Sequence, residues 1–175
     1  TLPLYHLTAP GWFVEGIAQY ESMKYEGDSW DTHREMMLRM AVLEDDLLSY
    51  ENMGVFGKDG HHSEMVYNHG FALLKYIGET YGDDKVRALV ETRPILNFKS
   101  TIKQVVGVSA NQLYRDWHAD LQARHGRLLD SVRTSGEREG DLLYDGGSLD
   151  YNPVYSPDGG RVAFLSNGDS DYALT

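Results

Sequence analysis

The sequence contains no cysteine, which excludes a disulfide framework, a thiolate metal site and a cysteine nucleophile. It also contains no apolar run that approaches the roughly 20 residues of a membrane-spanning helix. Positive charge is scarce, with 16 Lys and Arg residues against 27 Asp and Glu residues and a net charge of −11. Because phosphate groups are bound by positive charge, the sequence argues against nucleic acid or an anionic membrane surface as a partner.

Apolar residues make up 41% of the 175 residues, enough for a sizeable core, and most of them recur at helical spacing. A first helix is expected to open at Pro10, with Thr8 as its cap, since proline is tolerated in a first turn whose N–H groups have no helical partner. Further helices are expected over residues 30–48, 63–81, 83–92, 98–107 and from 109 onward. In the second helix, the apolar residues expected to face inward are Met36, Met37, Met40, Leu43 and Leu47. The sequence therefore predicts a mainly α fold, a helical array of about six helices over residues 1–128.

The composition changes after residue 128. Residues 129–147 are polar and rich in glycine, which is typical of a linker. In residues 148–175, Pro157-Asp158-Gly159 predicts a turn, residues 161–166 predict a strand, and a second turn near Gly168 predicts the start of a hairpin. Because a single hairpin is not stable alone in water, these strands are expected to belong to a larger sheet.

Glu15 is the unusual residue of the first helix. It lies next to Trp12 and Phe13 in a helix that is apolar around most of its circumference, so its carboxylate is expected to be buried. A buried carboxylate needs a cation or a metal ion to offset the loss of its hydration. Pairing with Arg34 or Arg39 is one interpretation, and metal coordination is the other.

Two helical segments resemble the gluzincin superfamily of zinc metallopeptidases. Residues 12–18, Trp-Phe-Val-Glu-Gly-Ile-Ala, are similar to the helix that supplies the third protein ligand to zinc in that family. Residues 66–70, Val-Tyr-Asn-His-Gly, resemble a downstream helix whose tyrosine donates a hydrogen bond to the tetrahedral intermediate of peptide hydrolysis. The resemblance implies that Glu15 is a zinc ligand and Tyr67 a catalytic residue. The other interpretation of Tyr67 is a core tyrosine with its hydroxyl at the edge.

The gluzincin pattern is incomplete in this sequence. Gluzincins hold zinc with two histidines and activate water with a glutamate, all from an HExxH helix that precedes the third ligand. No HExxH occurs here, and histidines such as His33, His61 and His118 lack the required spacing. We therefore expect the chain to be a fragment that starts just after that helix, and to be inactive alone because one carboxylate binds zinc weakly.

The histidines could also form an independent metal site. His61, His62, Glu64 and His69 carry suitable donors, but adjacent histidines do not face one metal ion well. His69 points to another side of its helix from Tyr67 and is expected at the surface or behind a ligand. Asp169 and Asp171 in the tail are too few carboxylates to predict a calcium site.

The tail resembles a second family. Residues 155–167 are similar to the repeat of TolB-like β-propellers, whose blades carry a Ser-Pro-Asp-Gly turn before a strand. The resemblance implies that residues 148–175 are the first strands of a propeller blade. It also implies a periplasmic, cell-envelope or secreted protein, with a possible protein partner on the propeller.

Two functions remain open at this stage. The first is a fragment of a zinc metallopeptidase that acts on a peptide or protein substrate, with zinc as cofactor and Glu15 and Tyr67 in its site. The alternative is a non-catalytic, peptidase-like module that supports a propeller in protein–protein binding at the cell envelope. An HExxH motif in a longer sequence would support the first function, and its absence there would exclude it.

Overall fold

The computed structural model describes residues 9–25, 32–57, 60–92, 97–136 and 150–166, together with 138, 140–144, 146 and 168. Within these residues the chain forms six α-helices, a short 3-10 helix and one antiparallel pair of strands. The elements are α1 (Gly11–Lys24), α2 (Thr32–Leu43), η2 (Asn52–Gly54), α3 (Gly60–Tyr81), α4 (Asp83–Glu91), α5 (Phe98–Val106), α6 (Ala110–Thr134), β1 (Asp150–Tyr155) and β2 (Val162–Ser166). The predicted mainly α fold is confirmed.

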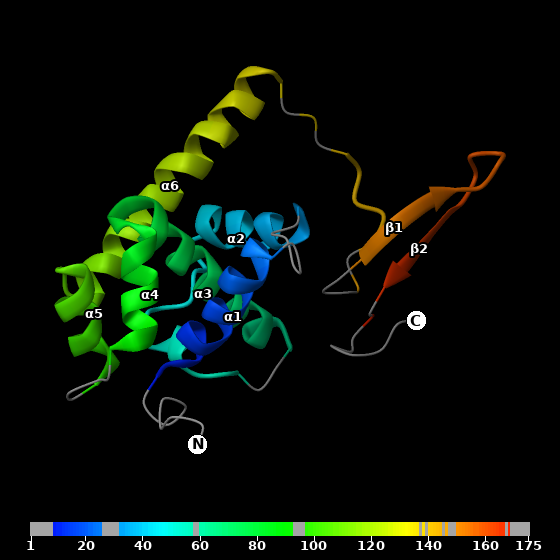
Figure 1. Cartoon of the computed structure of the whole chain (residues 1–175). Helices are drawn as coiled ribbons and strands as arrows, with labels where there is room; N and C mark the ends of the chain where they lie inside the picture. The colour runs from blue at the N-terminus through cyan, green and yellow to red at the C-terminus, as the bar shows by residue number, and fades with distance from the viewer. Residues whose placement is uncertain are drawn as a thin grey trace.

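The core lies among the helices and involves every one of them. Figure 1 shows α1 lying against α3, while α6 extends beyond the other helices. On α6, Leu113, Trp117 and Leu121 are buried at intervals of four residues, as the periodicity predicts. Ser109 caps this helix, since its hydroxyl accepts a hydrogen bond from the Gln112 backbone N–H. No helix among the described residues is long and apolar enough to cross a membrane.

The second helix differs from its prediction in length and in orientation. It ends at Leu43, because Asp45 adopts a left-handed backbone conformation with φ of 57°, which stops a helix. The start expected at residue 30 lies outside the described residues. The predicted inward face was wrong for Met36, Met40 and Leu43, which are exposed, whereas Leu47 after the helix packs against the core. The residues of α2 that are buried in the core are Leu38, Ala41 and Val42.

The last helix is longer than predicted. α6 continues to Thr134, into the segment expected to be a linker. No proline interrupts it, and the first left-handed residue after it is Gly136, with φ of 93°. The boundaries of the predicted domains are not tested by this difference and remain a prediction.

The tail forms a hairpin around the predicted Pro157-Asp158-Gly159 turn. β1 pairs antiparallel with β2, with Tyr155 opposite Val162, and its register shifts between Tyr151 and Val154. The shift spans Asn152, whose backbone is left-handed with φ of 55°, and Pro153, which has no N–H to donate to the ladder. The second turn and strand that the sequence predicts lie, except for Gly168, outside the described residues, as do Asp169 and Asp171.

Candidate functional site

Aromatic side chains anchor α1 in the core. Trp12 and Phe13 are buried, and the Phe98 ring on α5 lies 5.8 Å from the Trp12 ring and 4.4 Å from the Phe13 ring. Tyr20 is also buried, so Trp12, Gly16 and Tyr20 form an inward stripe at intervals of four residues. Glu15 lies beside this stripe and is half-buried, not fully buried as its apolar neighbours predict.

Two glycines allow α1 and α3 to cross in backbone contact. A methyl group at Gly16 would lie 2.7 Å from the Gly70 carbonyl oxygen and 2.8 Å from the Phe71 nitrogen. A methyl group at Gly70 would lie 2.9 Å from the Trp12 carbonyl carbon. Because real side chains do not tolerate such distances, only glycine permits this crossing. Glu15 directly precedes one glycine, and Tyr67 lies about one helical turn before the other.

The crossing brings Glu15 and Tyr67 together. The Tyr67 hydroxyl faces the Glu15 carboxylate, and both side chains are half-buried. Burial raises the pKa of Tyr67, and the negative charge of Glu15 and its hydrogen bonding to the phenol raise that pKa further. The arrangement therefore keeps Tyr67 protonated, as a hydrogen-bond donor at the edge of a carboxylate.

Two further side chains adjoin this pair. Glu64 precedes Tyr67 on the same face of α3, and its negative charge also contributes to the raised pKa of Tyr67. The Phe56 ring, on the loop after η2, lies 5.8 Å from the Tyr67 ring at an angle of 49°. Carboxylates and an aromatic ring thus surround the Tyr67 phenol.

His69 is a core residue, which corrects the expectation of a surface position. Its side chain is fully buried and its ring lies 5.9 Å from the Trp117 ring. Burial lowers the pKa of His69, with smaller contributions from the charges of His61 and His62, to about 3. His69 is therefore neutral at physiological pH and takes no part in the candidate site.

The described residues around Glu15 can be compared with the set of ligands that a zinc site requires. The ion pairs found among the described residues include those of Lys24 with Glu21 and Asp83 and of His125 with Glu35, and none of these involves Glu15. The pairing of Glu15 with Arg34 or Arg39 stays a prediction. The described residues contain no group of three His, Asp or Glu side chains that could hold a metal ion. A half-buried carboxylate with a phenol beside it fits one zinc ligand and its hydrogen-bond partner. It does not make a complete zinc site, which needs further protein ligands.

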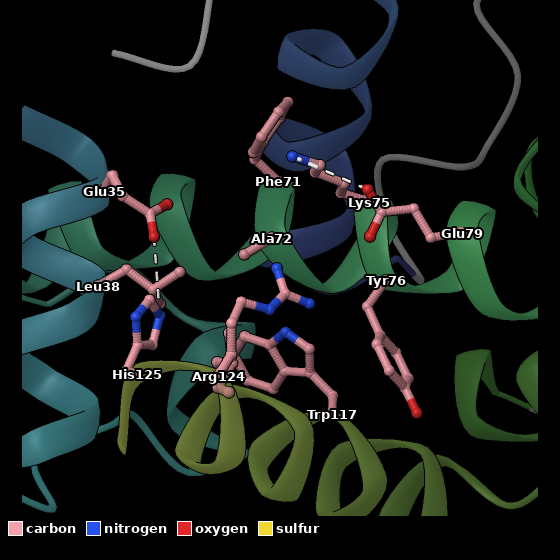
Figure 2. Close-up of a pocket in the computed structure, with 11 residues that line it drawn as sticks. Glu35, Leu38, Phe71, Ala72, Lys75, Tyr76, Glu79, Trp117, Arg124 and His125 are labelled. Carbon is pink, nitrogen blue, oxygen red and sulfur yellow. Dashed lines mark ion pairs between the residues drawn. The ribbon is translucent and has the colours of Figure 1, made fainter. Parts of the chain in front are cut away.

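A small cavity between α2, α3 and α6 is a separate feature (Figure 2). Its volume is about 30 Å³, which accommodates a water molecule but no peptide. His125 on α6 is buried at its edge, with Nε2 3.7 Å from the Glu35 carboxylate of α2. Burial lowers the pKa of His125, and the Glu35 charge opposes this effect. Neither Glu15 nor Tyr67 lines this cavity, so it is separate from the Glu15 site.

Comparison with known families indicates a metallopeptidase-like fold for this helical body. Residues 5–123 match the Peptidase MA superfamily, and the chain belongs to this superfamily. Its members are generally zinc-dependent peptidases, so a peptide is the class of substrate that membership implies. Neither a curated protein nor a solved structure matches the chain.

Sequence reasoning identified Glu15 and Tyr67 separately but missed their neighbours. The Gly16–Gly70 contact had a signal, because a glycine inside a helix costs about 1 kcal/mol relative to alanine and so indicates close packing. No sequence pattern pointed to Phe56, because its contact with Tyr67 depends on how two distant segments pack.

Proposed function

We propose that the chain is part of a gluzincin-type zinc metallopeptidase that hydrolyses peptide bonds, with Glu15 as the third protein ligand of the zinc ion. The observation that carries this proposal is the pairing of Glu15 with Tyr67, which come from two distant segments. Membership of the Peptidase MA superfamily supports it. The half-buried position of Glu15 supports it as well, because a cation or a metal ion offsets the partial loss of carboxylate hydration.

The two residues have different roles in this proposal. Bound zinc supplies Lewis-acid polarisation of the peptide carbonyl and a water molecule of lowered pKa. Glu15 provides a negatively charged oxygen that holds the ion. The single hydroxyl proton of Tyr67, which in this structure faces Glu15, would be donated instead to the oxygen on which negative charge develops.

The remaining zinc ligands are not in this sequence, which contains no HExxH. We propose that two histidines and a glutamate base from such a helix, outside the sequence given, complete the site in the intact protein. This chain alone is then inactive and binds zinc no more tightly than micromolar, because a single carboxylate is a weak ligand. Calorimetric titration of the chain with zinc tests this point, and a submicromolar site would contradict it.

Metal content and peptide hydrolysis in the full-length protein test the site. Glu15→Gln should lose bound zinc, because the amide is neutral. Tyr67→Phe should keep zinc but lose about 100-fold in kcat, the usual effect of removing one hydrogen-bond donor to the oxyanion. Glu21→Gln, on the same helix and paired with Lys24 at the surface, is the matched control and should change neither property.

Other outcomes separate the alternatives. Zinc retained in Glu15→Gln would show that Glu15 is not a ligand, and normal turnover in Tyr67→Phe would remove the catalytic role of Tyr67. If the full-length protein has no HExxH, binds no zinc and hydrolyses no peptide, the non-catalytic alternative replaces the peptidase proposal.

For the tail, we propose that the hairpin begins a TolB-like β-propeller that presents a substrate or binds a protein partner in the periplasm, the cell envelope or the medium. Its turn is well ordered by hydrogen bonds: the Ser156 hydroxyl donates to Asp158 at 2.5 Å, and the Arg161 N–H donates to Ser156 at 2.9 Å. Val154 and Tyr155 are exposed, as expected for strands that further strands would cover. Deletion of residues 148–175 should leave the melting temperature of the helices unchanged, and a clear decrease would contradict a separate domain.

A further inference from the structure

The loop after η2 presents two apolar side chains beside the candidate site. Val55 is 60% exposed and Phe56 is 48% exposed, whereas Met53 just before them is fully buried. The rings of Phe56 and Tyr67 are in contact, with centroids 5.8 Å apart. An exposed apolar residue is ordinary by itself. This ring differs because it touches the tyrosine that faces Glu15.

Both ends of the loop are held by contacts, so the position of Phe56 is set in the free protein. A methyl group at Gly11 would lie 3.4 Å from the Phe56 ring, which shows that the ring rests on the first turn of α1. After Phe56, Gly57 lies against the side chain of His62. The His62 Nε2 atom is 3.4 Å from the Asn52 carbonyl oxygen at the start of η2. A ring held in this way loses little conformational freedom when a ligand binds.

We infer that Phe56, together with Val55, binds an apolar side chain of the peptide substrate next to the bond that is cleaved. This inference rests on the proposed function. Gly11 lies one helical turn before Glu15, so a ring over Gly11 lies beside both members of the Glu15–Tyr67 pair. A peptide whose carbonyl group lies at this pair places a neighbouring side chain on the Phe56 ring.

The negative charges near the Phe56 ring also limit which substrate side chains can bind there. Two carboxylates, Glu15 and Glu64, lie close enough to Tyr67 to act on its hydroxyl. An acidic substrate side chain on Phe56 would lie near both of them, and like charges repel. The surface therefore favours an apolar side chain and disfavours Asp or Glu.

The experiment measures peptide binding to the 175-residue chain by NMR titration. The probes are acetyl-Ala-Phe-Ala-amide and the matched peptide with Asp in the centre. The wild-type chain should bind the Phe peptide about tenfold more tightly, within the range for apolar pockets, with shift changes at Phe56 and Tyr67. Phe56→Ala should reduce this preference to about threefold or less. Phe56→Leu should keep most of it, because an apolar side chain remains.

Two further variants keep the test decisive. Val55→Ser, at a more exposed position, should weaken binding of the Phe peptide even if Phe56→Ala fails to fold. Val90→Ala removes a side chain that is 42% exposed on α4 and should change nothing. The inference is overturned if the wild-type chain binds neither peptide, binds both equally, or keeps its preference in Phe56→Ala. Because these titrations contain no zinc, their result is independent of whether Glu15 proves to be a zinc ligand.

Discussion

The hydroxyl of Tyr67 on α3 faces the carboxylate of Glu15 on α1. Their proximity depends on the crossing of the two helices at Gly16 and Gly70, where the backbones are in direct contact. A phenol beside a carboxylate is a hydrogen-bond donor whose proton is retained at neutral pH. Several properties of this arrangement and of the surrounding fold can be measured directly.

The first prediction concerns the ionisation of Tyr67. Burial raises its pKa, and Glu15 raises it further by charge and hydrogen bonding. Glu15→Gln removes the negative charge, so the pKa of Tyr67 should fall, while burial keeps it above the usual value. Titration of tyrosine labelled with carbon-13 at Cζ, followed by NMR, measures this change. Glu21→Gln should leave the Tyr67 titration unchanged, and an equal pKa in wild type and Glu15→Gln would contradict the pairing.

The second prediction concerns the helix crossing. Gly16→Ala places a methyl group 2.7 Å from the Gly70 carbonyl oxygen, so α1 and α3 must move apart. We expect the free energy of unfolding to decrease by about 1–3 kcal/mol, as for other overpacked positions. Gly126→Ala is the matched control, because a methyl group there would have no neighbour within 4 Å. The control should be neutral or stabilising by up to about 1 kcal/mol, owing to the higher helix propensity of alanine. Equal effects at both sites in urea unfolding would argue against the close crossing.

The third prediction concerns acid stability. His69 is buried and its pKa is lowered to about 3, below its ordinary value of 6.5. Between these pH values the unfolded chain binds a proton that the folded chain does not, so stability falls as the pH falls. This group contributes a slope of up to about 1.4 kcal/mol per pH unit.

The variant His69→Leu tests this contribution. The His69 nitrogens have no hydrogen-bond partner among the described residues, so an apolar replacement leaves no partner unsatisfied. The stability of the variant, measured by urea unfolding from pH 7 to 4, should depend less on pH than that of wild type. Val90→Ala, at an exposed position that carries no titratable group, should retain the wild-type dependence. A steep, unchanged slope in His69→Leu would assign the acid loss to other groups.

The fourth prediction concerns the contact between α1 and α4. The Tyr20 hydroxyl donates a hydrogen bond to Asp83 Oδ1 at 2.5 Å, and Lys24 Nζ lies 3.2 Å from Asp83 Oδ2. Tyr20→Phe removes the first bond and should destabilise the protein by about 1 kcal/mol. The pKa of Asp83, which the hydrogen bonds from Tyr20 and Lys24 lower, should rise in this variant. Tyr25→Phe, at a side chain that is 82% exposed, should have no effect on thermal unfolding or on Asp83.

Periodicity predicted the helices well where one face is apolar and the other polar. Leu113, Trp117 and Leu121 are buried as expected. It failed on α2, where apolar residues occur on several sides: Met36 and Met40 were expected inside and are exposed. Periodicity identifies which side chains share a face, but where both sides offer apolar residues, the neighbouring helices decide which of them is buried.

Residues that favour the start or the end of a helix also predicted only some of the observed helix boundaries. Pro10 and Ser109 indicated the starts of α1 and α6, because their effects are local. The end of α2 was not predicted, since it depends on an aspartate, Asp45, in a left-handed conformation. The propensity of aspartate for that conformation is small, and the packing of the following segment decides whether it is adopted.

For the candidate site, the sequence by itself determined the chemical types and the two helices that carry them, Glu15 in an aromatic helix and Tyr67 in a second one. Only the tertiary structure decided that these side chains meet, that Glu15 is half-buried, and that Phe56 lies beside them. The reason is physical: residue types and spacing act locally along the chain. The distance between two helices depends instead on the contact of Gly16 with Gly70, which exists only after both helices have packed.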